Sequence, residues 1–155
     1  MFERFTQAGI AIAGIDVGES YGSPDGRKRF TALYDELVTH RGFAPKPVLL
    51  GRSRGGLMTL NWAAENPDKV GGFAGIYPVC SFVSWPGVEK ASPAYGLTPE
   101  ELGARLAEHN PIDRLAPLAK AGVPLFAIHG NADDVVPLEG NSGEMRKRYE
   151  ALGGK

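Results

Sequence analysis

A serine flanked by glycines two residues away on either side has the residue types and spacing of a covalent catalyst, in the stretch Gly51-Arg52-Ser53-Arg54-Gly55. An apolar run, Val48–Leu50, precedes it, and the segment from Leu57 to Ala64 follows with apolar residues at helical spacing. At such a strand-to-helix turn, the glycines let the two backbones approach while the serine projects outward. The pattern predicts a nucleophilic Ser53. The alternative interpretation is an ordinary tight turn with a capping serine.

A second group of polar residues follows a later apolar run, Val123 to Ile128, and reads His129-Gly130-Asn131-Ala132-Asp133-Asp134. A carboxylate a few residues beyond a strand end is well placed to orient the imidazole of a serine–histidine–acid triad. From the residues alone, Asp133 and Asp134 are both candidates for this acid.

Together the two motifs resemble the α/β-hydrolase superfamily, in particular its esterase, dienelactone-hydrolase and prolyl-oligopeptidase-like branches. The matching parts are the glycine-flanked serine and an HGxxDxxVP block at residues 129–137, and the resemblance covers nearly the whole chain. It implies a serine hydrolase of carboxylic esters that forms an acyl-enzyme and needs no cofactor. Ser53 would be the nucleophile, Asp133 the triad acid with Asp134 as its rival, and the Arg54 backbone N–H an oxyanion donor.

The chain departs from this family pattern at the histidine. The superfamily places its catalytic histidine in a loop after one more strand, and this sequence ends at Lys155, where that strand should begin. None of the three histidines fits the position. His129 matches a structural histidine of the HGxxDxxVP block, and His40 sits near a helix C-terminus. His109 is an alternate base only if its imidazole reaches the serine within hydrogen-bond distance.

Four strand-like runs alternate with segments of helical period, at residues 10–17, 48–50, 70–77 and 123–128. This order predicts an α/β fold: a three-layer sandwich around a mostly parallel sheet of about four strands, a truncated or minimal α/β-hydrolase-like domain spanning residues 1–155. Ser23 and Pro24 should begin one helix and Thr98 another, which runs through Glu108. The stretch 138–152 should form a last helix.

By family strand order a missing strand would lie between 10–17 and 48–50, so these two runs either pair directly or another segment fills the gap. That strand's loop would supply the second oxyanion donor.

Residues 78–121 form a long, proline-divided stretch that we interpret as a lid-like insertion. Trp85 and Tyr95 are candidates to line a substrate pocket, with core packing as the plainer alternative. Arg52 is a candidate to hold a substrate carboxylate or phosphate. Arg52 and Arg54 could instead pair with nearby carboxylates such as Asp16 or Glu19.

Composition narrows the function classes further. Seventeen Lys and Arg against eighteen Asp and Glu give a net charge of −1, which argues against nucleic acid or an anionic membrane as a partner and favours a small uncharged or locally anionic ligand. The resemblance implies that this ligand is a small-molecule ester substrate. A single cysteine and three scattered histidines predict no metal site. No apolar run approaches the ~20 residues that cross a bilayer, so we expect a soluble protein with the cytoplasm as its default compartment. A sheet without its outer strands should expose its edges, which predicts a homo-oligomer or a complementing segment.

Overall fold

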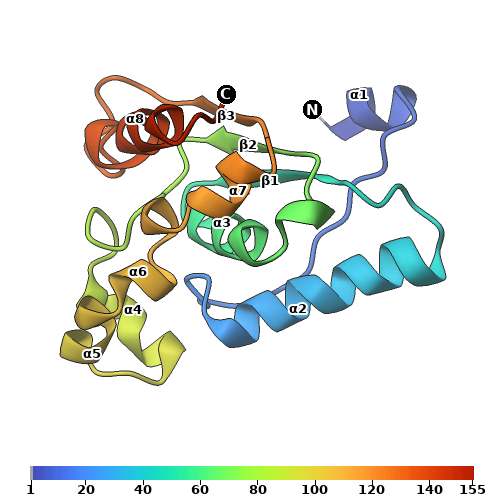
Figure 1. The fold of residues 1–155 in the computed structure, drawn as a ribbon. Coiled ribbons are helices and arrows are strands. Elements are labelled where there is room, and N and C mark those ends of the chain that lie inside the picture. Colours follow the sequence, from blue (N-terminus) through green and yellow to red (C-terminus); the bar gives the residue numbers. More distant parts are fainter. Residues whose placement is uncertain (1) are drawn as a thin grey trace.

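The computed structural model describes residues 2–155 and contains a parallel three-stranded sheet (Figure 1). Its strands are β1 (Val48–Arg52), β2 (Gly72–Ile76) and β3 (Leu125–Ile128), in the order β1-β2-β3. The register aligns Arg52 with Ile76 and Ile76 with Ile128, so the carboxyl ends of all three strands meet at one edge. The predicted α/β-hydrolase-like fold with a parallel sheet is confirmed, with three strands instead of about four.

Helices connect the strands and follow the last of them. They are α1 (Phe2–Gln7), α2 (Pro24–Asp35), α3 (Gly55–Glu65), α4 (Val88–Tyr95), α5 (Pro99–Ala104), α6 (Leu106–His109), α7 (Ala116–Lys120) and α8 (Glu144–Ala151). Turns of π-helix extend α2 over Glu36–His40 and precede α8 over Glu139–Gly143, and 3₁₀ turns cover Pro67–Lys69 and Pro111–Asp113. No helix within residues 2–155 is both long and apolar enough to span a membrane.

The predicted helix starts are confirmed at Ser23 and Thr98. The Ser23 hydroxyl accepts a hydrogen bond from the Gly26 N–H, and Pro24 occupies the first helical position. Thr98 forms a capping box, in which its hydroxyl accepts from the Glu101 N–H while the Glu101 carboxylate accepts from the Thr98 N–H. The predicted helix through Glu108 breaks at Arg105 and becomes α5 and α6.

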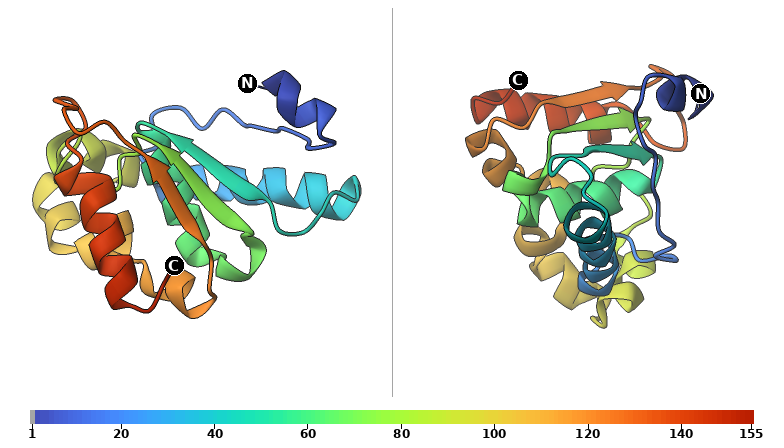
Figure 2. Two further views of the ribbon diagram at one scale, coloured as in Figure 1. Left: turned by 90° about the horizontal axis from the view of Figure 1, so that it is seen from above. Right: turned by 90° about the vertical axis from the view of Figure 1, so that its right-hand side faces the viewer.

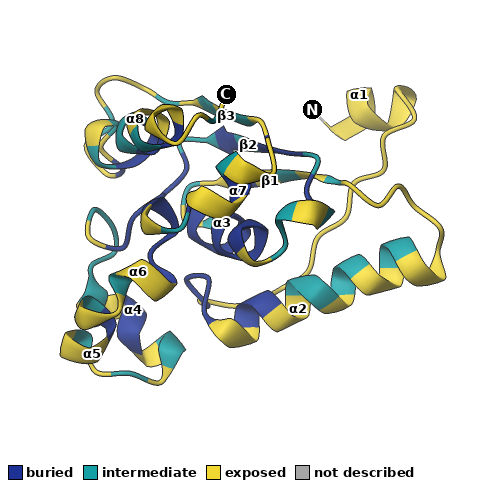
Figure 3. Cartoon of the chain, viewed as in Figure 1, coloured by how far each residue is buried: buried dark blue, intermediate teal, exposed yellow. Residues whose placement is uncertain are grey.

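Only one face of the sheet is covered by helices. Leu49, Phe73 and Leu125 pack into a core that α3, α7 and α8 complete. Figure 2 shows the sheet and the surrounding helices from two further directions. Their strand neighbours point the other way, so Val48 and Phe126 are 65% and 63% exposed (Figure 3). The alternation is that of a sheet with one buried face. Residues 2–155 therefore build two layers, and the predicted third layer is not among them.

The predicted strand at residues 10–17 is wrong. This segment is extended but belongs to no sheet, and Ile10, Ile12 and Ile15 are exposed. Residues 10–17 do not pair directly with β1, which was one of the two alternatives for the predicted gap beside that strand. A strand forms only where a neighbouring backbone supplies hydrogen bonds, and no strand of residues 2–155 pairs with this segment. The apolar composition was read correctly, but a single sequence does not show whether a partner strand is available.

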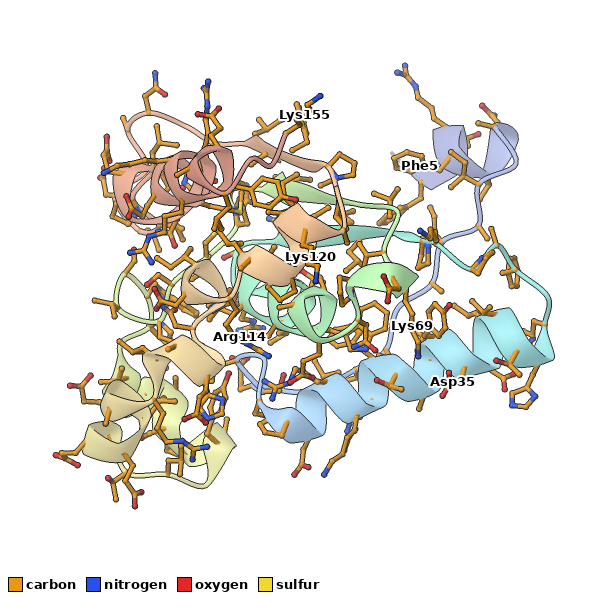
Figure 4. All side chains as sticks on the ribbon, viewed as in Figure 1. Phe5, Asp35, Lys69, Arg114, Lys120 and Lys155 are labelled. Atoms are coloured by element: carbon orange, nitrogen blue, oxygen red, sulfur yellow. The ribbon has the colours of Figure 1, made fainter. Side chains whose placement is uncertain are left out.

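Residues 78–121, the stretch interpreted above as an insertion, fold into α4 to α7. Helices α4 to α6 pack on a second apolar core, whereas Leu118 of α7 belongs to the first. The second core contains Tyr21, Leu57, Val79, Phe82, Ala91, Leu102 and Val136. A polar network fastens the insertion to α3 and α2. The Asn61 side-chain amide donates to the His109 carbonyl at 2.8 Å, and Arg114 donates to the Asn61 side-chain oxygen at 2.8 Å while pairing with Glu65 at 3.2 Å (Figure 4).

Candidate active site

Ser53 occupies a sharp turn between β1 and α3. Its φ of +51° lies in the left-handed region, which a residue with a side chain adopts only when the surrounding structure requires it. Its N–H donates to the Ile76 carbonyl at 3.0 Å and its carbonyl accepts from the Val79 N–H at 2.8 Å, so both backbone groups are bound to β2 or to the chain after it. This is the backbone of a nucleophile elbow, at the carboxyl-terminal edge of the sheet.

Two glycines make the close approach at this turn possible. A Cβ on Gly51 would lie 2.7 Å from the Thr59 hydroxyl, and one on Gly56 would lie 2.8 Å from the Pro78 side chain and closer still to the Val79 carbonyl. A Cβ on Gly55 would have no atom within 4 Å. The steric requirement therefore falls on Gly51 and Gly56, and the second glycine of the GxSxG pattern is not packed against anything.

We expect Gly56→Ala to lower the free energy of unfolding by about 1–3 kcal/mol, because the methyl group would force the start of α3 away from Pro78 and Val79 in the chain after β2. Gly55→Ala is the matched control. It should change the free energy of unfolding by less than about 0.5 kcal/mol, or raise it by stabilising the start of α3. Urea unfolding followed by circular dichroism measures both. Equal effects of the two substitutions would contradict this account of the turn.

Asp133 is held in the loop after β3. One of its carboxylate oxygens accepts hydrogen bonds from the Val135 N–H at 3.0 Å and the Val136 N–H at 2.8 Å. The hydrogen bond from Val136 is the main reason that the pKa of Asp133 lies below its ordinary range, so the group is a carboxylate near neutral pH. Its second oxygen makes no hydrogen bond within residues 2–155 and lies 3.8 Å from His129 Nε2. Asp134 is exposed.

His129 has the structural role expected for it. Its Nε2 lies 2.7 Å from the Val136 carbonyl, and its Nδ1 lies 2.7 Å from the Ser142 hydroxyl. A carbonyl only accepts, so Nε2 carries a proton and Nδ1 of the neutral ring accepts from the hydroxyl. With both ring nitrogens engaged and the side chain 2% exposed, this imidazole holds the Asp133 loop against the start of the last helical segment.

His109, the alternate base, lies between the insertion and α3. Its imidazole packs 5.0 Å from the Tyr95 ring, and neither ring nitrogen has a hydrogen-bond partner within residues 2–155. Burial is the largest cause that holds its pKa below the ordinary value, and the charges of Arg105 and Arg27 add to it. Within the described residues, no histidine hydrogen-bonds to Ser53.

The buried His109 should make stability depend on pH. Because its pKa is lowered in the folded state, the unfolded chain binds the proton first as pH falls. The free energy of unfolding is then greatest above the ordinary pKa of about 6.5 and falls below it, by at most about 1.4 kcal/mol per pH unit for one proton. His109→Leu should reduce this slope between pH 7 and 5, whereas substitution of the exposed His40 by Gln should leave it. Urea unfolding across this range would contradict the account if both variants kept the wild-type slope.

The two arginines beside the nucleophile have different partners. Arg54 pairs with Glu19 at 2.6 Å, which is one of the expected ion pairs, and both side chains are about half exposed. Arg52 donates from Nε to the Tyr77 hydroxyl, and its guanidinium lies over the Tyr77 ring, 5.5 Å from the centroid. The Arg54 backbone N–H has no acceptor within residues 2–155, so it is available as an oxyanion donor.

Tyr77 is a residue of this site that the sequence analysis did not select. It follows β2 directly, has a φ of +37°, and its N–H donates to the Ile128 carbonyl at 2.7 Å. The signal available in the sequence was its position at the end of a glycine-rich strand-like run, next to the elbow by parallel pairing. An aromatic residue at a strand end is common, so the sequence by itself did not distinguish it.

The insertion's two aromatic candidates pack into the second apolar core. Tyr95 lies edge-on to Phe82, and its hydroxyl donates to the Tyr21 carbonyl at 2.9 Å. Trp85 is half-buried, with Tyr21 at a ring distance of 6.1 Å. A hollow of about 710 Å³ lies between the insertion and α8, and its lining includes Ser81, Asn110, Asp113, Glu144 and Arg148. Neither aromatic residue nor Ser53 lines it. The two aromatic side chains have the contacts of core residues.

Comparison with known proteins identifies the family. The model of the prolyl oligopeptidase family matches residues 29–147, a range that contains both Ser53 and Asp133. The chain belongs to the prolyl oligopeptidase family. This family lies within the α/β-hydrolase superfamily and makes the chain a member of a serine hydrolase family.

A solved structure similar to this prolyl oligopeptidase family chain is that of Mycobacterium tuberculosis MPT51 (FbpC1), with a TM-score of 0.60 and 19% sequence identity. The match covers 88% of this chain and 56% of that one, so the chain spans little more than half the length of the solved protein. At this identity the likeness shows the fold. A comparison with curated proteins found no match.

Metal-binding side chains do not gather in this family member. Across residues 2–155, histidine, cysteine, aspartate and glutamate nowhere form a group of three or more that could hold a metal ion.

Proposed function

We propose that this chain carries the nucleophile and acid of a serine hydrolase that acts on carboxylic esters through an acyl-enzyme. The observation that carries the proposal is the strained turn at Ser53, whose φ of +51° places the serine at the carboxyl-terminal edge of the parallel sheet. Such strain is retained at functional sites because it presents a group for reaction. A capping serine in an ordinary turn would not need it.

In the proposed reaction, the Ser53 hydroxyl attacks the ester carbonyl carbon and loses its proton to a histidine. The bond to the alkoxy oxygen then breaks, and the alcohol leaves with the proton that the histidine returns. Water afterwards hydrolyses the acyl-enzyme, which releases the carboxylic acid and restores the Ser53 hydroxyl. The Arg54 N–H stabilises the oxyanion that forms on the carbonyl oxygen. Asp133 orients the histidine. The carboxylate of Asp133 is fixed and ionised and has one free oxygen, which favours Asp133 over the exposed Asp134 as the triad acid. The histidine is the group that the described residues do not supply, because His129 is engaged and His109 is buried elsewhere.

A fluorophosphonate probe tests the nucleophile directly. We expect slow labelling of Ser53 at neutral pH, located by peptide mapping, because the turn and the Arg54 N–H are in place while the base is absent. Ser53→Ala should remove the label, and Ser84→Ala, a change in the insertion, should not. Absence of any label on folded, monodisperse protein would favour the alternative function, a hydrolase-like module that binds a small ligand or partner without turnover.

A further inference from the structure

Residues 2–17, which we call the arm, carry apolar side chains that face solvent. None of the residues of α1 is buried, and the exposed apolar side chains of the arm are Phe2, Phe5, Ile10, Ile12 and Ile15 (Figure 4). Within the extended part, the backbone of residues 11–17 donates no hydrogen bond to another backbone group of residues 2–155. An apolar, extended segment with a free backbone is a strand that lacks its neighbour.

The matching free edge lies on β1. This strand pairs with β2 on one side, and no strand of residues 2–155 pairs with its other side. Val48 and Leu50 project from it with 65% and 46% of their surface exposed. A flat, apolar edge of this kind is a template for pairing with another chain.

The arm of the same chain does not close this edge. After the arm, the loop at Tyr21 and Gly22 is fixed, because the Tyr95 hydroxyl donates to the Tyr21 carbonyl and Arg27 donates to the Gly22 carbonyl at 2.6 Å. Arg29 also donates to the Asp16 carbonyl. With its end fastened to α2 and to the insertion, the arm runs past β1 without pairing (Figure 2).

We propose that the 155-residue chain forms a strand-exchanged dimer, in which residues 10–17 of each copy pair with the free edge of β1 of the other. Each chain has both the segment 10–17 and a free edge of β1. Two copies can therefore make the same contact twice, in a closed assembly with two-fold symmetry. Each arm then becomes a fourth strand in the sheet of the other copy.

Charge favours a parallel arrangement. Asp16 is the only charged residue of residues 10–17, and β1 ends at Arg52, which has no ion-pair partner within residues 2–155. Parallel pairing places Asp16 of one copy beside Arg52 of the other, and it continues the direction of the existing sheet.

Main-chain hydrogen bonds hold the proposed contact together. The backbone of residues 11–17 donates to no other backbone group of residues 2–155, and the outer edge of β1 is unpaired within the same residues. Pairing of the two would satisfy both rows of polar groups. It would also place Ile10, Ile12 and Ile15 beside the side chains of β1 in one sheet.

Cross-linking of two different single-cysteine variants tests the exchange. One chain carries Ile12→Cys, and a second chain carries Val48→Cys together with a C-terminal tag that makes it larger. The two are mixed and treated with a short bis-maleimide, and the reaction is quenched before denaturation. We expect a heterodimer band on a denaturing gel. The native Cys80 is fully buried and should not react. As a control, the second chain carries Lys147→Cys, on the solvent side of α8, in place of Val48→Cys. The heterodimer band should then be absent.

Light scattering gives the second readout. Ile12→Lys should weaken dimerisation at least tenfold without changing the circular dichroism spectrum, because the arm contributes nothing to either apolar core. Val83→Lys, at an even more exposed apolar position in the insertion, should leave the dimer unchanged. A wild-type chain that is monomeric at high concentration, or a double Ile12→Cys/Val48→Cys chain that cross-links only within itself, overturns the proposal.

Discussion

The 155-residue chain is expected to hydrolyse p-nitrophenyl acetate several orders of magnitude more slowly than a complete serine hydrolase. Loss of a triad member leaves only binding and oxyanion stabilisation, typically a residual ~10³–10⁴-fold over water. Here the base is the absent member, since His129 is engaged and His109 is buried without a path to Ser53. Turnover above the Ser53→Ala background should appear only when a complementing segment supplies a strand and a histidine.

The control for this first expectation is His109→Ala beside Ser53→Ala. If the wild-type chain is strongly active and His109→Ala abolishes turnover while the fold is retained, the base lies in the insertion. In that case both the structural role of the buried His109 and the incomplete triad are wrong.

The second large effect concerns the sheet. Phe73→Ala should destabilise the chain by about 3–5 kcal/mol, because its ring is 2% exposed and packs beneath the elbow between β1 and α3. Phe126→Ala, on the neighbouring strand but the opposite face and 63% exposed, should cost less than about 1 kcal/mol. Chemical unfolding of the two variants measures the difference. Comparable losses would contradict a sheet that is covered on one face only.

Local signals in the sequence were sufficient for most elements. The strands near Val48, Gly72 and Leu125 and the helix starts at Ser23 and Thr98 depend on apolar runs and on capping residues close by, and each is confirmed. The segment at residues 10–17 failed because a strand also needs a partner, and pairing is a long-range property that an apolar run does not contain.

In the candidate site, too, the features that depend on local sequence were predictable and those that depend on long-range contacts were not. The turn at Ser53 and the loop at Asp133 follow from short motifs whose glycines and backbone hydrogen bonds act within a few residues. The contact of Tyr77 with Arg52 joins two strands and depends on their register, which the sequence does not show. Tyr95 could have been a pocket residue or a core residue by its chemistry, and its partner is the carbonyl of Tyr21, 74 positions earlier in the chain.

The central claim is that Ser53 is a poised nucleophile with no histidine base beside it among residues 2–155, and rescue by free imidazole tests it most directly. Intact-mass spectrometry of the fluorophosphonate adduct should show labelling of Ser53 that rises at least tenfold with imidazole concentration. The rise should be absent in Ser53→Ala and in urea-unfolded protein. Labelling of folded chain that imidazole does not change, or that is the same in Ser53→Ala, would contradict the account.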